Sequence, residues 1–288
     1  MDRADTIPIF VISLPDSSRF DPLKKRLIEF NIPFEKIEAI DGQAIDENEL
    51  PKLYDERRAL KTIGRPMTRG EIGNALSHRK VWRIIIERNL AAALVLEEDA
   101  IIDRAFCSFL RTLKEIPTKI GFLSLYTQDG RVFRRARVQI SEFGLHRAAV
   151  GLPNTVAYII RANYARMLLD RGTRVENPTD WPLSHLEREQ YLVFPMPVTH
   201  HYDESVIDHE RTTMIQEKRK PIKTIWPSWI PAWLRATAYV TCVVYLLRPD
   251  RYDGFVDYFR RQIALRLRLA MYDTVAVAQL GCGRRENI

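Results

Sequence analysis

The chain has 288 residues, of which 46% are hydrophobic, and a formal net charge of +7 at pH 7. This length and apolar content support one sizeable α/β domain with an appendage. Its three cysteines are widely spaced and form no ligand pair, which argues against a disulfide framework and fits a reducing compartment. No recognised nucleic-acid-binding motif accompanies the positive charge, so we do not expect nucleic acid as a partner.

The amino-terminal segment predicts a strand, a loop, a helix and a second strand. Residues 7–14 form an apolar run, residues 23–30 have a helical pattern rich in lysine and arginine, and residues 34–40 again read as a strand. Both strands end in polar loops. We therefore expect Arg19 near a diphosphate and Asp41 near a ribose or base, although Asp41 and Gly42 fit an ordinary turn equally well.

Residues 67–82 predict a helix that packs on the sheet. Thr68 followed by Glu71 is a capping-box pattern, and the apolar residues behind it recur at helical spacing. The other side of this helix carries an unusual polar set, which predicts an edge that faces a ligand: Asn74, Ser77, His78 and Arg79. A histidine on a helix is also often a hydrogen-bonded structural residue, so His78 has both interpretations.

The most informative segment is residues 91–100, AAALVLEEDA, in which an apolar strand leads directly into three carboxylates. Ligands of open α/β sheets gather beyond the carboxyl ends of such strands. Adjacent carboxylates repel one another unless cations compensate, and hard oxygen ligands suit Mg²⁺ or Mn²⁺. Strand alternation predicts Glu97 and Asp99 on one side. A strand that ends in a solvated acidic turn is the alternative interpretation.

Further elements follow in the second hundred residues. We expect helices at 106–115 and 163–170, strands at 121–126, 155–160 and 191–198, and a basic, solvated face at 131–137. The loop 177–182 places Asp180 beside Trp181 between two prolines, and Asp180 is either a general base or a helix cap. His200 or His201 could complete a metal shell, although adjacent histidines in loops are more often surface residues.

The positive charge belongs to the carboxyl-terminal part. Residues 211–288 hold 14 lysines and arginines against 6 acidic residues, whereas residues 1–210 are close to neutral. Three tryptophans and clustered arginines in this part favour contact with a membrane surface. The 12-residue apolar run at 236–247 is shorter than the roughly 20 residues that a membrane-spanning helix needs. A helical subdomain packed on the first domain is the alternative.

Taken in order, four segments resemble the pattern of glycosyltransferase family 25, a family of lipooligosaccharide-type sugar transferases. They are VISLPDSSRF at 11–20, EAIDG at 38–42, TRGEIGNALSHRKVW at 68–82 and LVLEEDA at 94–100, with weaker similarity at 155–161, 178–181 and 194–207. An ordered set is far more specific than any single motif. Members of the family usually carry Glu-Asp-Asp where this chain has Glu97-Glu98-Asp99, and commonly a cysteine where Asn74 stands.

The resemblance implies a GT-A-like fold in residues 1–210, with a Rossmann-like mixed, mostly parallel sheet flanked by helices. Charge and composition add a basic helical appendage in residues 211–288. It implies a metal-dependent, inverting transfer of a hexose, expected to be galactose, from a UDP-sugar to a lipid-linked saccharide. The product would belong to lipopolysaccharide, lipooligosaccharide or another surface polysaccharide. The cysteine usage, the lack of a signal-peptide pattern before residue 7 and the basic tail together predict a cytoplasmic enzyme, peripheral on the cytoplasmic face of the inner membrane.

Roles for individual residues follow from the resemblance. Glu97 and Asp99 would bind Mn²⁺ or Mg²⁺, Glu98 would orient the metal shell or the donor, and Asp180 would deprotonate the acceptor hydroxyl. Six residues would line the nucleotide side: Ser13, Arg19, Asp41, Ser77, His78 and Arg79. The competing hypothesis is a degenerate domain, disabled by Glu98, that binds nucleotide sugar or glycolipid without turnover. A metal-dependent nucleotide hydrolase is disfavoured because no water-activating cluster is apparent.

Overall fold

The computed structural model describes residues 7–200 except 129, 150, 153, 171–172 and 179–189, together with residues 274–276. The predictions for Asp180, His201, the boundary at residue 210 and the appendage at 211–288 lie outside the described residues. Among the described helices, none has the length and apolar content that crossing a membrane requires.

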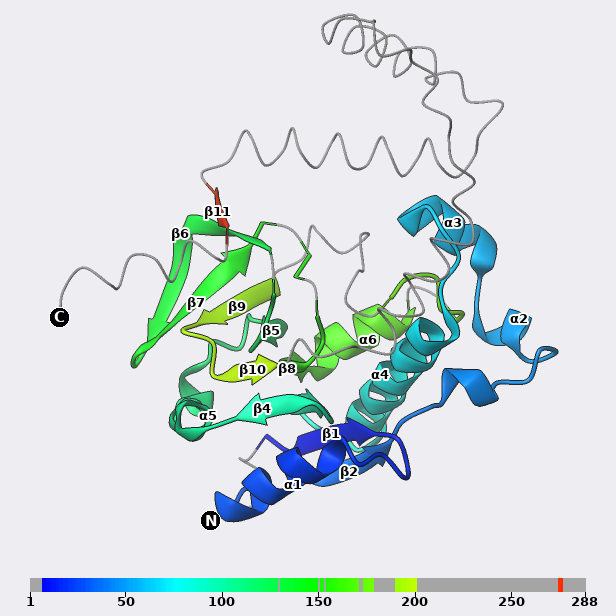
Figure 1. Cartoon of the computed structure of the whole chain (residues 1–288). Helices are drawn as coiled ribbons and strands as arrows, with labels where there is room; N and C mark the ends of the chain where they lie inside the picture. Colours follow the sequence, from blue (N-terminus) through cyan, green and yellow to red (C-terminus); the bar gives the residue numbers. More distant parts are fainter. Residues whose placement is uncertain are drawn as a thin grey trace, which may run out of the picture.

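A mixed sheet forms the centre of the fold (Figure 1). Its described strands are β1 (Ile9–Ser13), β2 (Glu35–Glu38), β3 (Ala92–Glu97), β5 (Phe122–Ser124), β6 (Arg131–Ile140), β7 (Phe143–Ala148), β8 (Ala157–Arg161), β9 (Gln190–Phe194) and β11 (Thr274–Ala276). They lie in the order β11-β6-β7-β9-β5-β8-β3-β1-β2. Strands β1, β2, β3, β5, β6 and β9 run in one direction, which confirms the mixed, mostly parallel sheet.

Helices cover both faces of the sheet, because successive side chains of its buried strands point to opposite faces. In β3, Leu94 and Leu96 pack in one cluster with α1 (Phe20–Glu29) and α5 (Arg104–Leu110). Ala93 and Val95 point the other way, into a cluster with α4 (Arg69–Glu87) and α6 (Ala162–Asp170). Because alternate side chains of a strand point to opposite faces, a strand that is apolar throughout must be covered on both.

Short elements complete the described part of the fold. A second, two-stranded sheet pairs β4 (Ala100–Ile102) with β10 (Val198–His200), antiparallel. The segment between β2 and α4 holds η2 (Gly42–Ala44), α2 (Leu50–Leu53) and α3 (Glu56–Ile63), and η3 (Leu113–Glu115) follows α5. The two short helices α2 and α3 were not predicted, because their apolar residues are too few to show a clear helical period.

Several predicted boundaries change for identifiable reasons. Helix α1 begins at Phe20 rather than residue 23, since Pro22 lies in the first turn, where its missing N–H costs no hydrogen bond. The basic stretch predicted as a solvated face at 131–137 forms the first part of β6, and Arg131 and Arg137 are exposed there. The apolar run at 191–198 divides into β9, which ends at Phe194, and β10, which begins at Val198.

The start of α4 is fixed by the predicted capping box. Thr68 Oγ1 accepts a hydrogen bond from the Glu71 backbone N–H at 3.1 Å, and a Glu71 carboxylate oxygen accepts one from the Thr68 N–H at 2.8 Å. Arg65 forms a bidentate ion pair with the same carboxylate, at 2.6 and 2.8 Å. The cap therefore satisfies two backbone donors and compensates a buried charge, which sets the direction in which α4 enters the fold.

The chain order around β1 creates the site. Strand β1 pairs in parallel with β2 on one side and with β3 on the other. The connection from β1 to β2 therefore leaves on one side of β1, and the chain returns to its other side to form β3. Such a reversal opens a crevice at the carboxyl ends of the strands, where α/β proteins bind ligands. Ser13 and Glu97 end β1 and β3 at this edge.

A close backbone contact holds η2 against α4 beside this edge. A Cβ atom on Gly73 would lie 2.6 Å from both the Gly42 nitrogen and the Ile40 oxygen, and one on Gly42 would lie 1.8 Å from the Arg69 oxygen. Gly73 therefore allows a backbone approach that a residue with a Cβ atom would block. Its contact places the end of β2 directly against the polar face of α4.

We predict that Gly73→Ala destabilises the fold by about 1–3 kcal/mol, because the added methyl group meets backbone atoms that cannot rotate away. Urea unfolding followed by circular dichroism measures the loss. Gly70→Ala, in the first turn of the same helix, is the control for the helix propensity that alanine adds. Equal unfolding midpoints for the two variants would contradict the proposed contact.

Candidate active site

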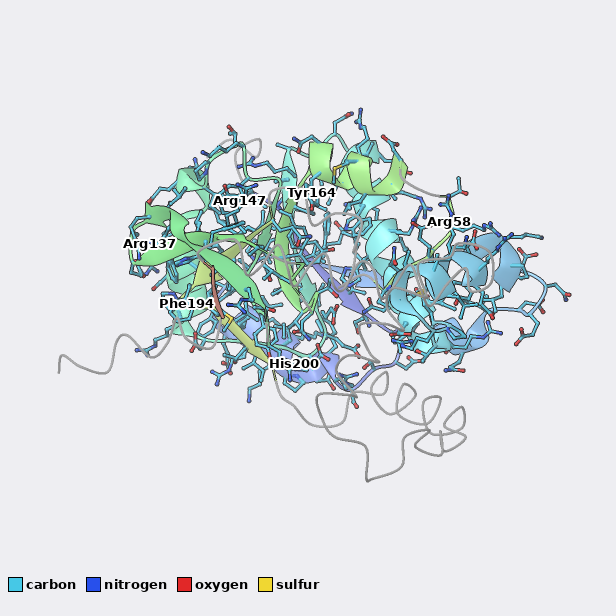
Figure 2. All side chains as sticks on the ribbon, turned by 90° about the horizontal axis from the view of Figure 1, so that it is seen from above. Arg58, Arg137, Arg147, Tyr164, Phe194 and His200 are labelled. Atoms are coloured by element: carbon cyan, nitrogen blue, oxygen red, sulfur yellow. The ribbon has the colours of Figure 1, made fainter. Side chains whose placement is uncertain are left out.

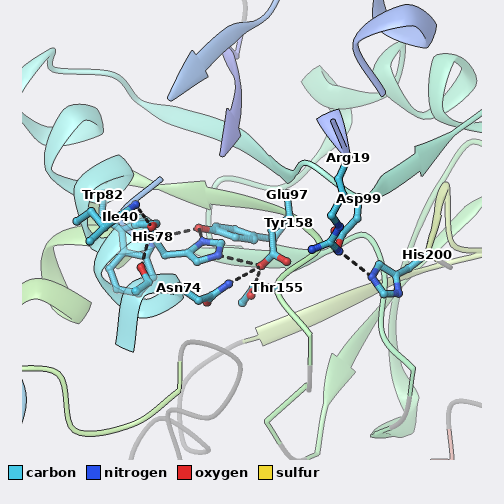
Figure 3. A network of polar contacts seen from close by, with 12 residues as sticks. Arg19, Ile40, Asn74, His78, Trp82, Glu97, Asp99, Thr155, Tyr158 and His200 are labelled. Atoms are coloured by element: carbon cyan, nitrogen blue, oxygen red, sulfur yellow. Dashed lines mark hydrogen bonds and ion pairs between the residues drawn. The ribbon is translucent and has the colours of Figure 1, made fainter. Parts of the chain in front are cut away.

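Glu97, the last residue of β3, is the most extensively hydrogen-bonded acid of the crevice (Figure 3). Its Oε1 atom accepts hydrogen bonds from Thr155 Oγ1 at 2.6 Å, His78 Nε2 at 2.9 Å and Asn74 Nδ2 at 3.4 Å. Asn74 and His78 lie four residues apart, on one face of α4. The predicted polar face of α4 thus meets the predicted acidic strand end, with Glu97 as the meeting point.

Behind Glu97 lies a buried chain of hydrogen bonds. His78 is fully buried, and its Nδ1 lies 2.8 Å from the Tyr158 hydroxyl, which also accepts a hydrogen bond from Trp82 Nε1 at 3.1 Å. One proton arrangement satisfies every group: His78 carries its proton on Nε2 and donates to Glu97, while Tyr158 donates to Nδ1. Neutral His78 then links the helix, the sheet and Glu97 without a buried unpaired charge.

These donors keep Glu97 ionised. Burial by itself raises the pKa of a carboxyl group, but the hydrogen bonds from His78, Thr155 and Asn74 hold the pKa of Glu97 well below 4.5. Burial raises the pKa of the Tyr158 hydroxyl, so that group remains a proton donor. The Glu97 side chain is 18% exposed and presents a fixed negative charge to the crevice.

Glu98 and Asp99 form a turn that interrupts strand geometry. The alternation that predicted Glu97 and Asp99 on one side therefore does not extend to Asp99, and the two acids have different partners (Figure 3). Asp99 pairs with Arg19 and lies 3.3 Å from His200 Nε2 on β10. Arg19 Nη1 also lies 3.7 Å from a Glu98 oxygen. The hydrogen bond to Asp99 raises the pKa of His200.

The acidic turn keeps two carboxylate oxygens free for a ligand. Glu98 Oε2 and Asp99 Oδ1 are buried and have no hydrogen-bond partner among the described residues. Buried acceptors without partners are rare in folded proteins and mark sites where a ligand or ion is missing. The described residues contain no group of three or more His, Cys, Asp or Glu side chains arranged around a metal ion. Two hard oxygen donors still fit a cation that takes its other ligands from phosphate and water.

The remaining predicted nucleotide residues take different positions. Ser77 and His78 are buried, so they lie behind Glu97 rather than at the surface of the crevice. Ser77 Oγ accepts a hydrogen bond from the Ile40 N–H at 2.8 Å and donates one to the Gly73 carbonyl at 2.7 Å. Ser13 is also buried and donates to the Leu14 carbonyl at 3.0 Å. Asp41 is exposed and caps η2 by accepting a hydrogen bond from the Gln43 N–H at 2.9 Å. This agrees with the interpretation of Asp41 and Gly42 as an ordinary turn.

Arg79, the last of the predicted nucleotide residues, is directed toward the segment that precedes loop 177–182. It is half-buried and donates to the Thr173 carbonyl at 3.5 Å, and burial lowers its pKa. In the same region, Arg58 of α3 donates to Glu176 at 2.8 Å. Figure 2 shows Arg58 at one end of the molecule and Arg137 and Arg147, from β6 and β7, at the other. The basic stretch of β6 is thus remote from this segment.

Sequence reasoning missed the residues of the network that come from β8 and the segment before it. Thr155 lies 58 residues from Glu97 in the sequence, and Tyr158 lies 80 residues from His78. The weak family similarity at 155–161 was the one signal that pointed to them. Trp82 lies at the end of the helix predicted over 67–82, but no sequence pattern indicated the partner of its N–H.

We predict that Glu97 makes folding stability depend on pH in the acid range. Its pKa is lower in the folded than in the unfolded protein, so its contribution is complete above about pH 4.5 and is lost as the pH falls below that value. Melting temperatures between pH 3 and 6 should fall less steeply for Glu97→Gln than for the unaltered protein. Parallel curves would show that Glu97 has an ordinary pKa.

We further predict that Tyr158→Phe destabilises the protein by about 1–3 kcal/mol and weakens its acid stability, because His78 and Trp82 each lose a buried partner. Tyr54→Phe is the matched control, since the buried Tyr54 hydroxyl accepts from the Met67 N–H at 2.9 Å, away from Glu97. Both variants should lose stability in urea, but the pH dependence should change in Tyr158→Phe alone. A change of the same size in both would contradict the network.

Comparisons with known proteins agree with this geometry. The family model described as glycosyltransferase family 25 (LPS biosynthesis protein) matches residues 6–182. Human procollagen galactosyltransferase 2 is 36% identical over 170 residues, which cover 57% of this chain and 25% of that protein. Procollagen galactosyltransferase 1-A of Xenopus laevis is 31% identical over 121 residues, covering 39% and 19%.

A third relative carries a different description. Human inactive glycosyltransferase 25 family member 3 is 32% identical over 117 residues, covering 37% of this chain and 19% of that protein. The chain thus spans about a fifth to a quarter of the length of these relatives. The family match extends over more than half of the chain and includes the capped helix, the acidic strand end and the network that joins them. The chain belongs to glycosyltransferase family 25.

Proposed function

We propose that this protein is an inverting galactosyltransferase that uses UDP-galactose as donor, a divalent cation as cofactor and a lipid-linked saccharide as acceptor. Family membership supports sugar transfer, and the names of two relatives support galactose. The observation that carries the proposal is the acidic turn at the end of β3. It holds two buried, unpartnered carboxylate oxygens in the crevice where α/β sheets bind nucleotides.

Each described residue of the crevice has a physical task in this reaction. Glu98 Oε2 and Asp99 Oδ1 would hold Mn²⁺ or Mg²⁺, which when bound stabilises negative charge on the departing diphosphate. Glu97, fixed by its three donors, keeps a constant charge beside them and does not exchange protons at neutral pH. Arg19 compensates the acidic turn in the protein alone and, being 47% exposed, is within reach of a diphosphate.

The transfer itself is a single displacement in this proposal. The acceptor oxygen forms a bond to the anomeric carbon while the bond from that carbon to the diphosphate breaks, and UDP leaves with the electron pair. A general base takes the hydroxyl proton. Asp180 is the base proposed from the sequence, and it lies outside the described residues. The expected position of the enzyme at a cytoplasmic membrane face rests on the sequence of residues 211–288.

A degenerate domain that binds nucleotide sugar without turnover is the second candidate function. Two observations favour it: one relative is described as inactive, and Glu98 stands where the family usually has aspartate. A longer side chain at this position moves the carboxylate by about one methylene, which is enough to change the geometry of a bound cation. Glu98→Asp separates the candidates, because activity that appears only in this variant identifies a degenerate parent.

We predict that UDP-galactose raises the melting temperature of the purified protein and that this protection requires Mn²⁺. Asp99→Asn should abolish both the protection and sugar transfer while leaving the fold intact, since it removes a charged ligand at the same size. Glu142→Gln, an exposed acid in the turn between β6 and β7, is the matched control and should behave as the unaltered protein. Transfer at a normal rate by folded Asp99→Asn would overturn the proposed role of the acidic turn.

A further inference from the structure

A cavity of about 560 Å³ lies between α1 and β4, directly beside the acidic turn. This volume is in the range of sites that bind small ligands, roughly 300–1,000 Å³. Helix α1, strand β4 and the acidic turn form its walls. The lining includes Leu23, Lys25, Arg26, Glu98, Asp99 and Ile102. Neither the sequence motifs nor the proposed donor site accounts for the α1 side of this cavity.

The cavity is lined by acids of the turn and by basic residues of α1. On the side of the turn, Glu98 and Asp99 present the oxygens assigned above to the cation, so the cavity is continuous with the place of transfer. On the α1 side lie Lys25 and Arg26. Arg26 pairs with Glu29 at 3.2 Å, whereas Lys25 has no ion pair or hydrogen bond among the described residues. The ammonium group of Lys25 is therefore available for a ligand.

The cavity also has apolar lining residues. Leu23, Ala100 and Ile102 line the cavity and are themselves buried, so its floor is apolar. Sugar rings have an apolar C–H face and a polar rim, and pockets that combine an apolar surface with few polar groups hold such amphipathic ligands in one orientation. A saccharide on this floor would direct one part toward the acidic turn and another toward Lys25.

We propose that this cavity binds the acceptor saccharide and that the acceptor carries an anionic substituent, a phosphate or a carboxylate, which Lys25 holds. The inference rests on the proposed function, since it takes the acidic turn as the place of transfer. Lysine provides three donors and a compact positive charge, which suit either anion. The substituent would lie against the α1 wall and the reacting hydroxyl against the acidic turn, so Lys25 determines specificity without contacting the reacting atoms.

The test measures binding of three probes to the full chain by ligand-observed NMR: methyl β-galactoside, its 6-phosphate and the methyl β-glycoside of galacturonic acid, whose carboxylate is free. We expect the two anionic probes to bind roughly tenfold more tightly than the neutral one, the size of a charge-assisted contact. Lys25→Met should remove this preference. Lys24→Met, at the neighbouring exposed position of α1 and outside the cavity, should keep it. The two anionic probes distinguish a phosphate from a carboxylate.

Every other outcome overturns the inference. Equal binding of neutral and anionic probes, or equal losses in Lys25→Met and Lys24→Met, would show that Lys25 recognises no substituent. Inorganic phosphate binding as tightly as the sugar phosphate would show an anion site without a saccharide. Protection by UDP-galactose, measured on the same samples, separates the two proposals: protection without an anionic preference overturns this inference alone, and a preference without protection overturns the proposed donor.

Discussion

The structure depends on the hydrogen bonds that converge on Oε1 of Glu97. This carboxylate ends the central strand β3 and receives donors from α4 and from the segment that leads into β8. Because His78 is in turn held by Tyr158, and Tyr158 by Trp82, a single charge at the strand end joins helix and sheet through the interior. Removing Tyr158 would leave His78 Nδ1 and Trp82 Nε1 without their buried partner, and fully paired networks of this kind rigidify a site.

The neighbouring acids are arranged in the opposite way. Glu98 and Asp99 are compensated from outside by Arg19 and His200, and each keeps one buried oxygen without a partner. The contrast has a physical consequence. Glu97 stabilises the fold and keeps its charge, whereas the turn has two acceptor oxygens without partners among the described residues and is paired with Arg19, whose side chain is 47% exposed. Of the three adjacent carboxylates, Glu97 therefore stabilises the fold, whereas Glu98 and Asp99 are suited to binding a ligand.

The position of this turn explains how one edge of the sheet can serve both a donor and an acceptor. The crevice opens where the chain reverses around β1, and the cavity between α1 and β4 begins at the same two acids. Helix α1 follows β1 directly and therefore forms one wall of both regions, with Arg19 at its start and Lys25 a turn and a half further on. Short connections after parallel strands place such residues reliably at the carboxyl edge.

The sequence by itself determined the features that depend on local physical chemistry. The Thr68–Glu71 capping box, the apolar strand that ends at Glu97 and the ordered motifs of the family are all readable without coordinates, because caps and strand periodicity involve neighbours in the chain. Only the tertiary structure decided which acids have partners. The turn at Glu98 and Asp99 breaks the alternation, Ser77 and His78 prove to be buried, and Thr155 and Tyr158 arrive from a distant strand. Contacts of this kind depend on the order of strands in the sheet, which no local pattern encodes.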